Sequence, residues 1–213
     1  MNKQLAEKRW WDPDGRLEVF HVWKTIQGEG PFVGMPAVFV RLAGCNLQCS
    51  WCDTDYTSRR EFVGTDELLG RVLKEGGGCS LVVLTGGEPL RQNVIPFIEL
   101  VLAKGLRIQI ETNGLCYTKL PAEVSVVCSP KTNRIDDRMW PQIDALKYVV
   151  QFGCVGKDGL PTGLVRPPGG WEGDVYIQPL ADGSERHAQV AVELCLRFGY
   201  RLSLQIHKIV GLE

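Results

Sequence analysis

The sequence AVFVRLAGCNLQCSWCDT, residues 37–54, joins a mainly apolar run to a loop that carries three cysteines. Residues 37–42 are apolar apart from Arg41 and include valine and phenylalanine, a composition that predicts a β-strand. The glycine and polar residues that follow predict a loop directly after this strand. A short strand followed at once by a chemically distinctive loop is a pattern that recurs along the chain.

Further apolar runs of similar length predict strands at residues 19–23, 81–85, 107–111, 124–128, 146–150, 175–177 and 202–206. Amphipathic patterns between some of these runs predict helices at residues 65–75 with Thr65 as N-cap, 94–104 before Gly105, and 185–198 between Ser184 and Gly199. Strands that alternate with helices are typical of successive β-α units around a parallel sheet.

Polar motifs follow most of these strands, each at or near the strand's carboxyl end. Besides the cysteine loop they are TGGEP (85–89), ETNG (111–114), SPK (129–131), QPL (178–180) and QIHK (205–208). In a parallel β/α barrel these points share one rim, where active sites are built. A closed barrel of eight units needs about 250 residues, so 213 residues predict an open, partial barrel in one domain spanning residues 1–213.

The charge balance and the hydropathy pattern exclude several classes of protein. With 24 basic and 25 acidic residues the net charge is −1, which excludes a strongly cationic nucleic-acid binder. The longest run without a charged residue covers only residues 76–87, whereas a membrane span needs about 18 apolar residues. The first residues lack the apolar core of a secretory signal. We therefore expect a cytoplasmic protein with no membrane or nucleic-acid partner.

Residues 153–170 contain six glycines and three prolines. This composition excludes a regular helix or a central strand and predicts a long loop. A solvated connection is the favoured interpretation, and a lid or partner contact is the alternative.

The eight cysteines divide into two groups. Five stand apart in the sequence and are expected to be small buried apolar residues: Cys79, Cys116, Cys128, Cys154 and Cys195. The other three, Cys45, Cys49 and Cys52, lie within eight residues. Structural zinc normally takes four protein ligands, and no fourth cysteine or histidine lies near. An electron-carrying four-iron cluster also takes four cysteines, so three would leave one iron open to a substrate or cofactor.

CNLQCSWC resembles the Cys-x3-Cys-x2-Cys signature of the radical S-adenosylmethionine superfamily, including an aromatic residue, Trp51, before the third cysteine. TGGEP resembles the second motif of that superfamily, which receives the methionyl ammonium group. The resemblance implies a 4Fe–4S cluster on Cys45, Cys49 and Cys52. It also implies that S-adenosylmethionine chelates the open iron and is cleaved reductively to a 5′-deoxyadenosyl radical. The implied fold is α/β, a shortened parallel β/α barrel.

Motifs across nearly the whole chain are similar to the 7-carboxy-7-deazaguanine synthase family: TIQGEGPFVGMPAVFVRLAGC (25–45), CDT (52–54), ETNG, SPK, QPL and QIHK. The resemblance implies a lyase that converts 6-carboxy-5,6,7,8-tetrahydropterin to 7-carboxy-7-deazaguanine with loss of ammonia, toward queuosine. It also implies a homodimer, a magnesium ion, and a flavodoxin- or ferredoxin-like electron donor.

The same resemblance assigns roles residue by residue. The residues expected to hold S-adenosylmethionine are Trp51, Asp53, Gly87, Glu88, Ser129, Pro130, Lys131, Gln178, Pro179 and Leu180. Those expected to surround the pterin are Ile26, Gln27, Gly28, Glu29, Arg41, Thr85, His207 and the terminal Glu213. Thr54 stands at the magnesium position, with Asp53 and Asp55 as alternative ligands.

Three of these expectations are specific about geometry. The Glu88 carboxylate is expected beside the methionyl ammonium group. His207 is expected on the last strand. The terminal carboxylate and Arg41 are expected at opposite ends of the pterin, although the chain ends in Gly-Leu-Glu, whereas the family resemblance implies a proline-ended tail.

Two other functions would use a similar cysteine loop. One is a short activating enzyme that generates a glycyl radical on a protein partner, which TIQGEG and QIHK disfavour. The other is an iron–sulfur electron carrier without catalytic activity, which the missing fourth cysteine and the GGEP turn disfavour.

We predict that Cys45→Ala, Cys49→Ala or Cys52→Ala each abolishes the brown cluster chromophore, because each thiolate would hold one iron. Replacing any of the five isolated cysteines should leave it intact. Visible absorption and iron content after reconstitution measure the effect. A chromophore that survives loss of one of the three, or disappears with one of the five, contradicts the assignment.

Overall fold

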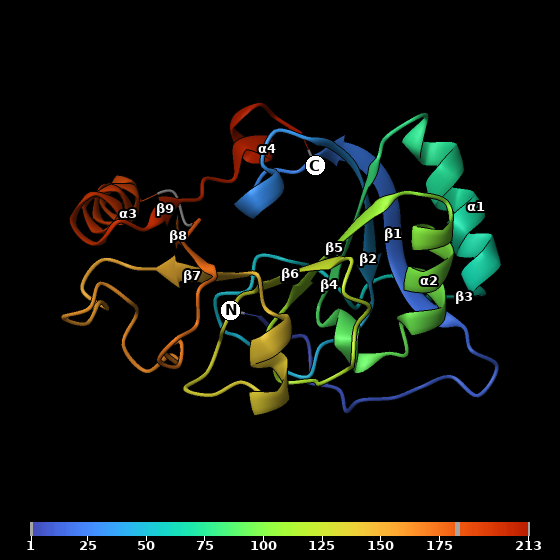
Figure 1. Ribbon diagram of the computed structural model, residues 1–213, viewed down its shortest axis with the longest axis horizontal. Coiled ribbons are helices and arrows are strands. Elements are labelled where there is room, and N and C mark those ends of the chain that lie inside the picture. Colours follow the sequence, from blue (N-terminus) through green and yellow to red (C-terminus); the bar gives the residue numbers. More distant parts are fainter. Residues whose placement is uncertain (1, 182–183, 213) are drawn as a thin grey trace.

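The computed structural model describes residues 2–181 and 184–212, in which nine strands form one sheet (Figure 1). The order across the sheet is β3-β1-β2-β4-β5-β6-β7-β8-β9. The strands are β1 (Leu17–Ile26), β2 (Pro36–Leu42), β3 (Glu61–Val63), β4 (Leu81–Gly86), β5 (Arg107–Thr112), β6 (Val124–Cys128), β7 (Ala145–Val150), β8 (Asp174–Pro179) and β9 (Arg201–Leu202).

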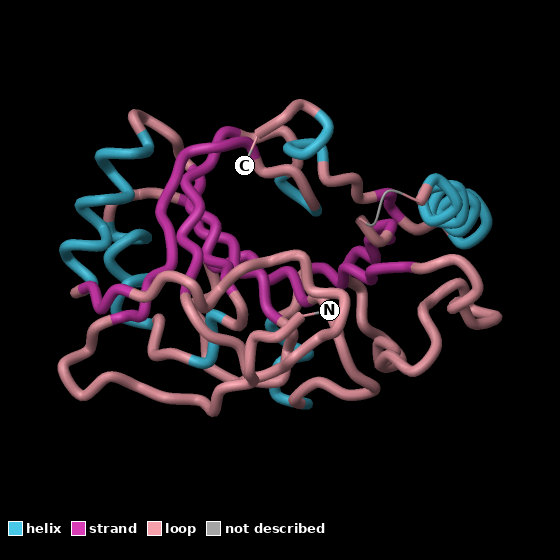
Figure 2. Tube along the Cα trace, turned by 180° about the vertical axis from the view of Figure 1, so that it is seen from behind, coloured by secondary structure: helices cyan, strands magenta, loops and turns pink. Residues whose placement is uncertain are grey.

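The sheet is parallel from β2 to β9, and only the edge formed by β1 and β3 is antiparallel. The two outer strands, β3 and β9, do not pair with each other, so the sheet does not close. Figure 2 shows the strands as an open arc. The predicted α/β fold with a partial barrel is therefore confirmed. The prediction of one domain over residues 1–213 stays a prediction, which this single sheet supports.

Helices α1 (Thr65–Gly76) and α2 (Ile95–Ala103) pack near one end of the arc and α3 (Glu185–Phe198) near the other, whereas the short α4 (Ile206–Ile209) lies between the two ends (Figure 1). The 3-10 turns are η1 (Gly30–Phe32), η2 (Pro89–Arg91) and η3 (Asp137–Gln142). The amphipathic helix α1 buries Leu68, Leu69 and Val72, as predicted. Its N-cap is Gly64, so Thr65 is the first helical residue and not the cap. No helix in the described part of the chain is long and apolar enough to cross a membrane.

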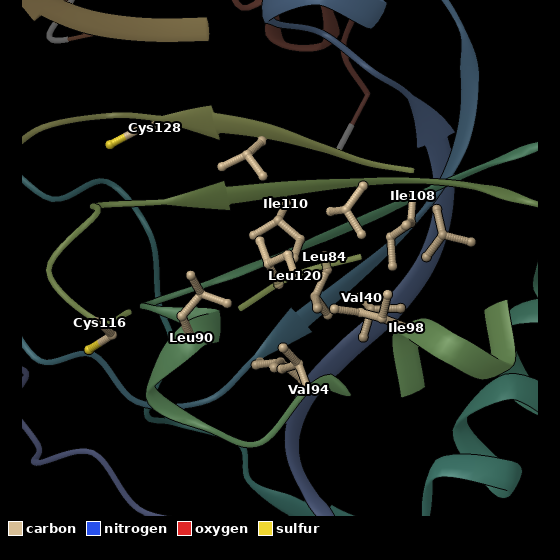
Figure 3. Close-up of a cluster of buried hydrophobic side chains, with 14 of the residues drawn as sticks. Val40, Leu84, Leu90, Val94, Ile98, Ile108, Ile110, Cys116, Leu120 and Cys128 are labelled. Atoms are coloured by element: carbon tan, nitrogen blue, oxygen red, sulfur yellow. The ribbon is translucent and has the colours of Figure 1, made fainter. Parts of the chain in front are cut away.

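The main core lies between the sheet and the helices α1 and α2. Val40, Leu84 and Ile110 from neighbouring strands meet Ile98 of α2 there (Figure 3), and each is fully buried. Successive side chains of a strand point to opposite faces. On β2, Val38, Val40 and Leu42 therefore enter this core, whereas Phe39 and Arg41 line a pocket on the other face. Burial of one face thus orients polar residues of the same strand toward the pocket.

Most predicted strands are confirmed to within a few residues, and residues 124–128 match β6 at both ends. The strand predicted at 202–206 is wrong: β9 covers only Arg201–Leu202, and His207 lies on α4. The amide nitrogen of Ile206 donates to the Gly28 carbonyl (3.2 Å), which turns the chain toward β1 at the point where α4 begins.

The loop predicted at residues 153–170 is confirmed, with one bridge between Val155 and Pro161. Of the five isolated cysteines, Cys116 and Cys128 are buried as predicted. Cys79 and Cys195 are half-buried. Cys154 is exposed because it lies in this glycine-rich loop, so its predicted burial is wrong.

Candidate active site

A cavity of about 260 Å³ lies on the pocket-facing side of the sheet, beside the carboxyl ends of the parallel strands. Residues of β1 and β2, the cysteine loop, the ends of β4 to β8, and α4 all line it. Parallel strands bring their carboxyl ends to a common edge, which explains how motifs far apart in the sequence meet here.

The three clustered cysteines form one wall of this cavity. Cys45 is buried, Cys49 and Cys52 are half-buried, and all three are free thiols. Burial raises the pKa of Cys45 to about 12, so a metal bound by this sulfur would have to displace its proton. Within the described residues, no three His, Cys, Asp or Glu side chains converge on a site for a single metal ion. A four-iron cluster does not need such convergence, because each thiolate binds a different iron.

The TGGEP turn lies directly against the cysteine loop. A Cβ atom on Gly87 would stand 2.3 Å from the Gly44 carbonyl oxygen and 2.7 Å from Cys45 Cβ. One on Gly86 would stand 2.3 Å from the Leu42 carbonyl oxygen. The Glu88 amide nitrogen also donates to the Gly44 carbonyl (3.0 Å). Glycine is therefore required at both positions, and the two motifs form one continuous wall.

Glu88 itself points away from the cavity. Its carboxylate is fully buried and accepts hydrogen bonds from the Leu90 amide (2.9 Å), the Thr112 hydroxyl (2.8 Å) and the Asn113 amide (2.7 Å). Burial raises the pKa of this carboxyl and these hydrogen bonds oppose the rise. The structure does not support the expected contact between this carboxylate and the methionyl ammonium group. The turn directs the Glu88 side chain into the protein, where it accepts hydrogen bonds from the ETNG loop.

Glu111, at the end of β5, is one of the carboxylates that do line the cavity, with Glu29 and Asp53. It accepts hydrogen bonds from Gln27 Nε2 (3.1 Å), Gln109 Nε2 (3.2 Å) and the Thr85 hydroxyl (3.1 Å). Burial raises its pKa, and the bonds from Gln27 and Thr85 oppose this. The sequence indicates through the ETNG motif that this position is polar and follows a strand. It does not show in which direction the Glu111 side chain points.

A buried ion pair joins β7 to the turn after β1. Lys147 contacts the Glu29 carboxylate, which also accepts a hydrogen bond from Gln205 Nε2 (2.7 Å). Burial, together with the nearby charge of Lys208, lowers the pKa of Lys147 to about 8. Sequence reasoning missed Lys147, although a lysine inside an apolar strand is a readable signal.

Lys131 follows β6 and lines the cavity beside the aromatic ring of Trp51, a residue of the cysteine loop. Its Nζ donates to the Ser129 carbonyl (3.0 Å) and hydroxyl (2.5 Å) and lies 5.4 Å from the centre of the Trp51 ring. Burial lowers the pKa of Lys131, and the Cys49 thiol opposes this. The predicted residues Trp51, Ser129 and Lys131 are thus brought together at the cavity.

The short helix α4 closes the cavity from the side of the TIQGEG turn. Lys208 forms an ion pair with Asp53 of the cysteine loop (2.7 Å). A Cβ atom on Gly28 would stand 1.9 Å from His207 Nδ1, so glycine at this position lets His207 reach the cavity. Burial lowers the pKa of His207, and Lys208 and Lys147 lower it further.

The structure places most of the predicted site residues on the cavity wall. These are Cys45, Cys49, Cys52, Thr54, Trp51, Asp53, Gly87, Ser129, Lys131, Gln178, Ile26, Gln27, Glu29, Arg41, Thr85 and His207. Five predicted residues do not line it: Gly28, Glu88, Pro130, Pro179 and Leu180. Glu213 lies outside the described residues. Wall residues absent from the prediction include Tyr56, Glu111, Asn113, Lys147 and Lys208.

Gln178, at the end of β8, gives a further indication of a ligand. It is buried and lines the cavity, and no donor within the described ranges reaches its Oε1 atom. A buried amide oxygen without a hydrogen bond is costly, so a ligand that donates to it is expected there.

Comparison with known proteins agrees with this architecture. The radical SAM superfamily model matches residues 40–128. The crystal structure of QueE from Escherichia coli has a similar fold, with a TM-score of 0.73 and 23% identity over 89% of this chain and 94% of that one. The fold and the cysteine loop thus define a radical S-adenosylmethionine protein, one that binds a 4Fe–4S cluster and S-adenosylmethionine.

Comparison with curated relatives identifies the family within this superfamily. The 7-carboxy-7-deazaguanine synthase of Rhodospirillum rubrum is 46% identical, covering 93% of this chain and 94% of the relative. Those of Rickettsia prowazekii and Aquifex aeolicus are 38% and 39% identical and cover 93% and 94% of this chain. The chain belongs to the 7-carboxy-7-deazaguanine synthase family.

We predict that Glu88→Gln lowers the free energy of unfolding of the iron-free protein by about 1–3 kcal/mol. An amide can no longer accept from all three donors, and one buried donor loses its partner. Urea unfolding measures the loss, and Glu99→Gln on the exposed face of α2 is the control. Unchanged stability together with weaker S-adenosylmethionine binding would instead favour direct contact with the cofactor.

Proposed function

We propose that the chain converts 6-carboxy-5,6,7,8-tetrahydropterin to 7-carboxy-7-deazaguanine with loss of ammonia. The observation that carries the proposal is that the cysteine wall and a wall of charged and amide side chains share one cavity. Family membership supplies the reaction, since the curated relatives are named for its product. Neither a glycyl-radical-activating enzyme nor an electron carrier is favoured by these relatives.

Cys45, Cys49 and Cys52 would hold the cluster, and S-adenosylmethionine would lie along the Gly87 backbone. When bound, these two groups supply the radical chemistry. Lys131, Ser129 and the Gln178 amide offer donors and acceptors on the same side of the cavity. The missing side chain of Gly87 leaves its backbone open to a close approach by the cofactor.

The opposite wall suits a pterin with a carboxylate. Arg41 lies on the pocket-facing side of β2 with its guanidinium 4.9 Å from the centre of the Trp23 ring. It would hold the substrate carboxylate through paired N–H donors. Glu111, Glu29 and Gln27 offer acceptors for the amino and ring N–H groups. Because Lys147 and Thr85 hold these two carboxylates in place, the wall is organised before substrate binds.

Magnesium would bind beside the cysteine loop at Thr54, which lines the cavity. The neighbouring Asp55 accepts from the Thr57 and Ser58 amides (3.0 and 3.1 Å) and does not line the cavity. Asp53 is paired with Lys208. These contacts favour the Thr54 hydroxyl, with substrate and water oxygens completing the shell.

The remaining expectations concern the setting of the enzyme. Family membership supports a homodimer that receives electrons from a flavodoxin- or ferredoxin-like protein. A reducing compartment such as the cytoplasm fits a chain whose eight cysteines are all free thiols.

The experiment that tests the function is anaerobic incubation of reconstituted protein with reductant, S-adenosylmethionine and the carboxytetrahydropterin. We expect a product with the mass of 7-carboxy-7-deazaguanine. Arg41→Ala should lower kcat/KM by roughly tenfold or more, the effect of losing a charged hydrogen-bonding partner, while cofactor cleavage without substrate continues. Arg107→Ala, at the exposed start of β5, is the control. Absence of the deazaguanine with intact cofactor cleavage would refute the proposed substrate.

A second prediction concerns the metal. Thr54→Ala should raise the Mg²⁺ concentration needed for half-maximal turnover, because a direct oxygen ligand is lost. Asp55→Ala should leave the titration unchanged, because its carboxylate serves a local turn. A shift in the Asp55 variant and none in the Thr54 variant would move the metal site to the aspartate.

A further inference from the structure

The first residues of the chain lie along the cysteine loop and do not line the cavity. We call residues 2–10 the N-terminal strap; they form no helix or strand. The Asn2 amide donates to the Ser50 carbonyl (3.3 Å), and the Glu7 amide donates to the Cys45 carbonyl (2.7 Å). Terminal residues are usually poorly ordered unless they are tied down, and these contacts tie the strap to the cysteine loop itself.

Gln4 makes the most extensive contact. Its Nε2 donates to the Thr54 carbonyl (2.8 Å), and its Oε1 accepts from the Tyr56 amide (2.8 Å) and the Thr57 hydroxyl (3.0 Å). One planar amide therefore satisfies a backbone acceptor and a backbone donor two residues apart, as a neighbouring strand would. The side chain is held in turn by Asn2, whose Oδ1 accepts from Gln4 Nε2 (3.1 Å).

The far end of the strap is fixed to the protein core through Arg91. This buried guanidinium donates to the Lys8 carbonyl (3.2 Å) and, through its other nitrogen, to the Ala43 carbonyl (3.2 Å). The Trp10 amide donates back to the Arg91 carbonyl (3.1 Å). Because Ala43 precedes the first cysteine by only two residues, Arg91 connects the strap and the start of the cysteine loop to the same core position.

The cysteine loop has no regular secondary structure of its own, since residues 43–60 contain no helix or strand. Its internal hydrogen bonds include the Gly44 amide with the Tyr56 carbonyl (2.9 Å), which joins its two ends, and the Cys52 amide with the Cys49 carbonyl (3.2 Å). Elsewhere, Asn113 Nδ2 donates to Asn46 Oδ1 (2.7 Å). A segment without the hydrogen-bond ladder of a helix or strand opens locally unless neighbouring elements hold it. The strap supplies hydrogen bonds at Cys45, Ser50, Thr54 and Tyr56, which span the loop from end to end.

We propose that the N-terminal strap is a positioning element of the iron–sulfur site: it holds the cysteine loop in its cluster-binding conformation and slows loss of iron. Gln4 is the central positioning residue. The strap contacts backbone atoms of the wall residues Cys45, Thr54 and Tyr56 and, through Asn2 Nδ2, the Tyr56 hydroxyl (3.3 Å), but none of these residues is proposed to bind the pterin. The proposal therefore concerns retention of the cluster and is independent of the identity of the substrate.

The test measures how fast reconstituted protein loses its cluster to an excess of an iron chelator under anaerobic conditions, followed by visible absorbance. Gln4→Ala should lose iron about tenfold faster, because three hydrogen bonds that oppose opening of the loop are removed. Gln4→Glu keeps the acceptor for Tyr56 but loses the donor to Thr54, so its rate should lie between. Leu5→Ala is the matched control, since this neighbouring side chain is 73% exposed and its rate should equal that of the unaltered protein.

A second measurement separates positioning from general stability. The urea midpoint of the iron-free Gln4→Ala protein should equal that of Leu5→Ala, because the strap adds little to the core. An unchanged rate of iron loss in Gln4→Ala overturns the proposal. A faster loss that is matched by an equal fall in the free energy of unfolding also overturns it.

Hydrogen exchange on the unaltered iron-free protein keeps the proposal testable even where Gln4→Ala fails to fold. The amides of Glu7 and Tyr56, which donate across the contact, should be protected and should exchange at similar rates. Rapid exchange of the strap beside a protected cysteine loop would show that the loop holds its shape alone and would refute the role of the strap.

Discussion

The close approach of two backbones, the turn after β4 and the loop after β2, is the constraint on which the site depends. Gly86 and Gly87 lie where any Cβ atom would stand less than 3 Å from backbone atoms of residues 42–44. This contact is possible only because β2 and β4 are neighbouring parallel strands in register, with Leu42 opposite Gly86. The cysteine loop and the TGGEP turn are thus parts of one rigid junction.

The fold could be predicted well from the sequence because the strands are short, apolar and separated by clear helix signals. The predicted bounds of β6 equal the observed ones. The failures have physical causes. β3 has only three residues, Glu61–Val63, and follows a loop that lacks periodicity. α4 has four residues, too few for a helical pattern, and it begins where a backbone contact with Gly28 turns the chain.

The site was predicted to the level of its motifs but not to the direction of every side chain. Glu88 and Glu111 both belong to polar motifs at the ends of parallel strands, yet one carboxylate braces a neighbouring loop and the other faces the cavity. The pair of Lys147 and Glu29 joins residues 118 positions apart. A local motif indicates which functional groups lie at the end of a strand. Contacts between strands determine which of their atoms face the ligand.

The alternation along β2 also has an evolutionary consequence. The side chains of Val38, Val40 and Leu42 are constrained by packing in the core. Those of Phe39 and Arg41 line the cavity and face the molecule that occupies it. Selection can therefore act almost independently on neighbouring positions of β2. The core-facing residues conserve their volume, while the cavity-facing residues can change their chemistry. An open sheet of this kind lets the range of substrates drift among descendants while the scaffold beneath them stays the same.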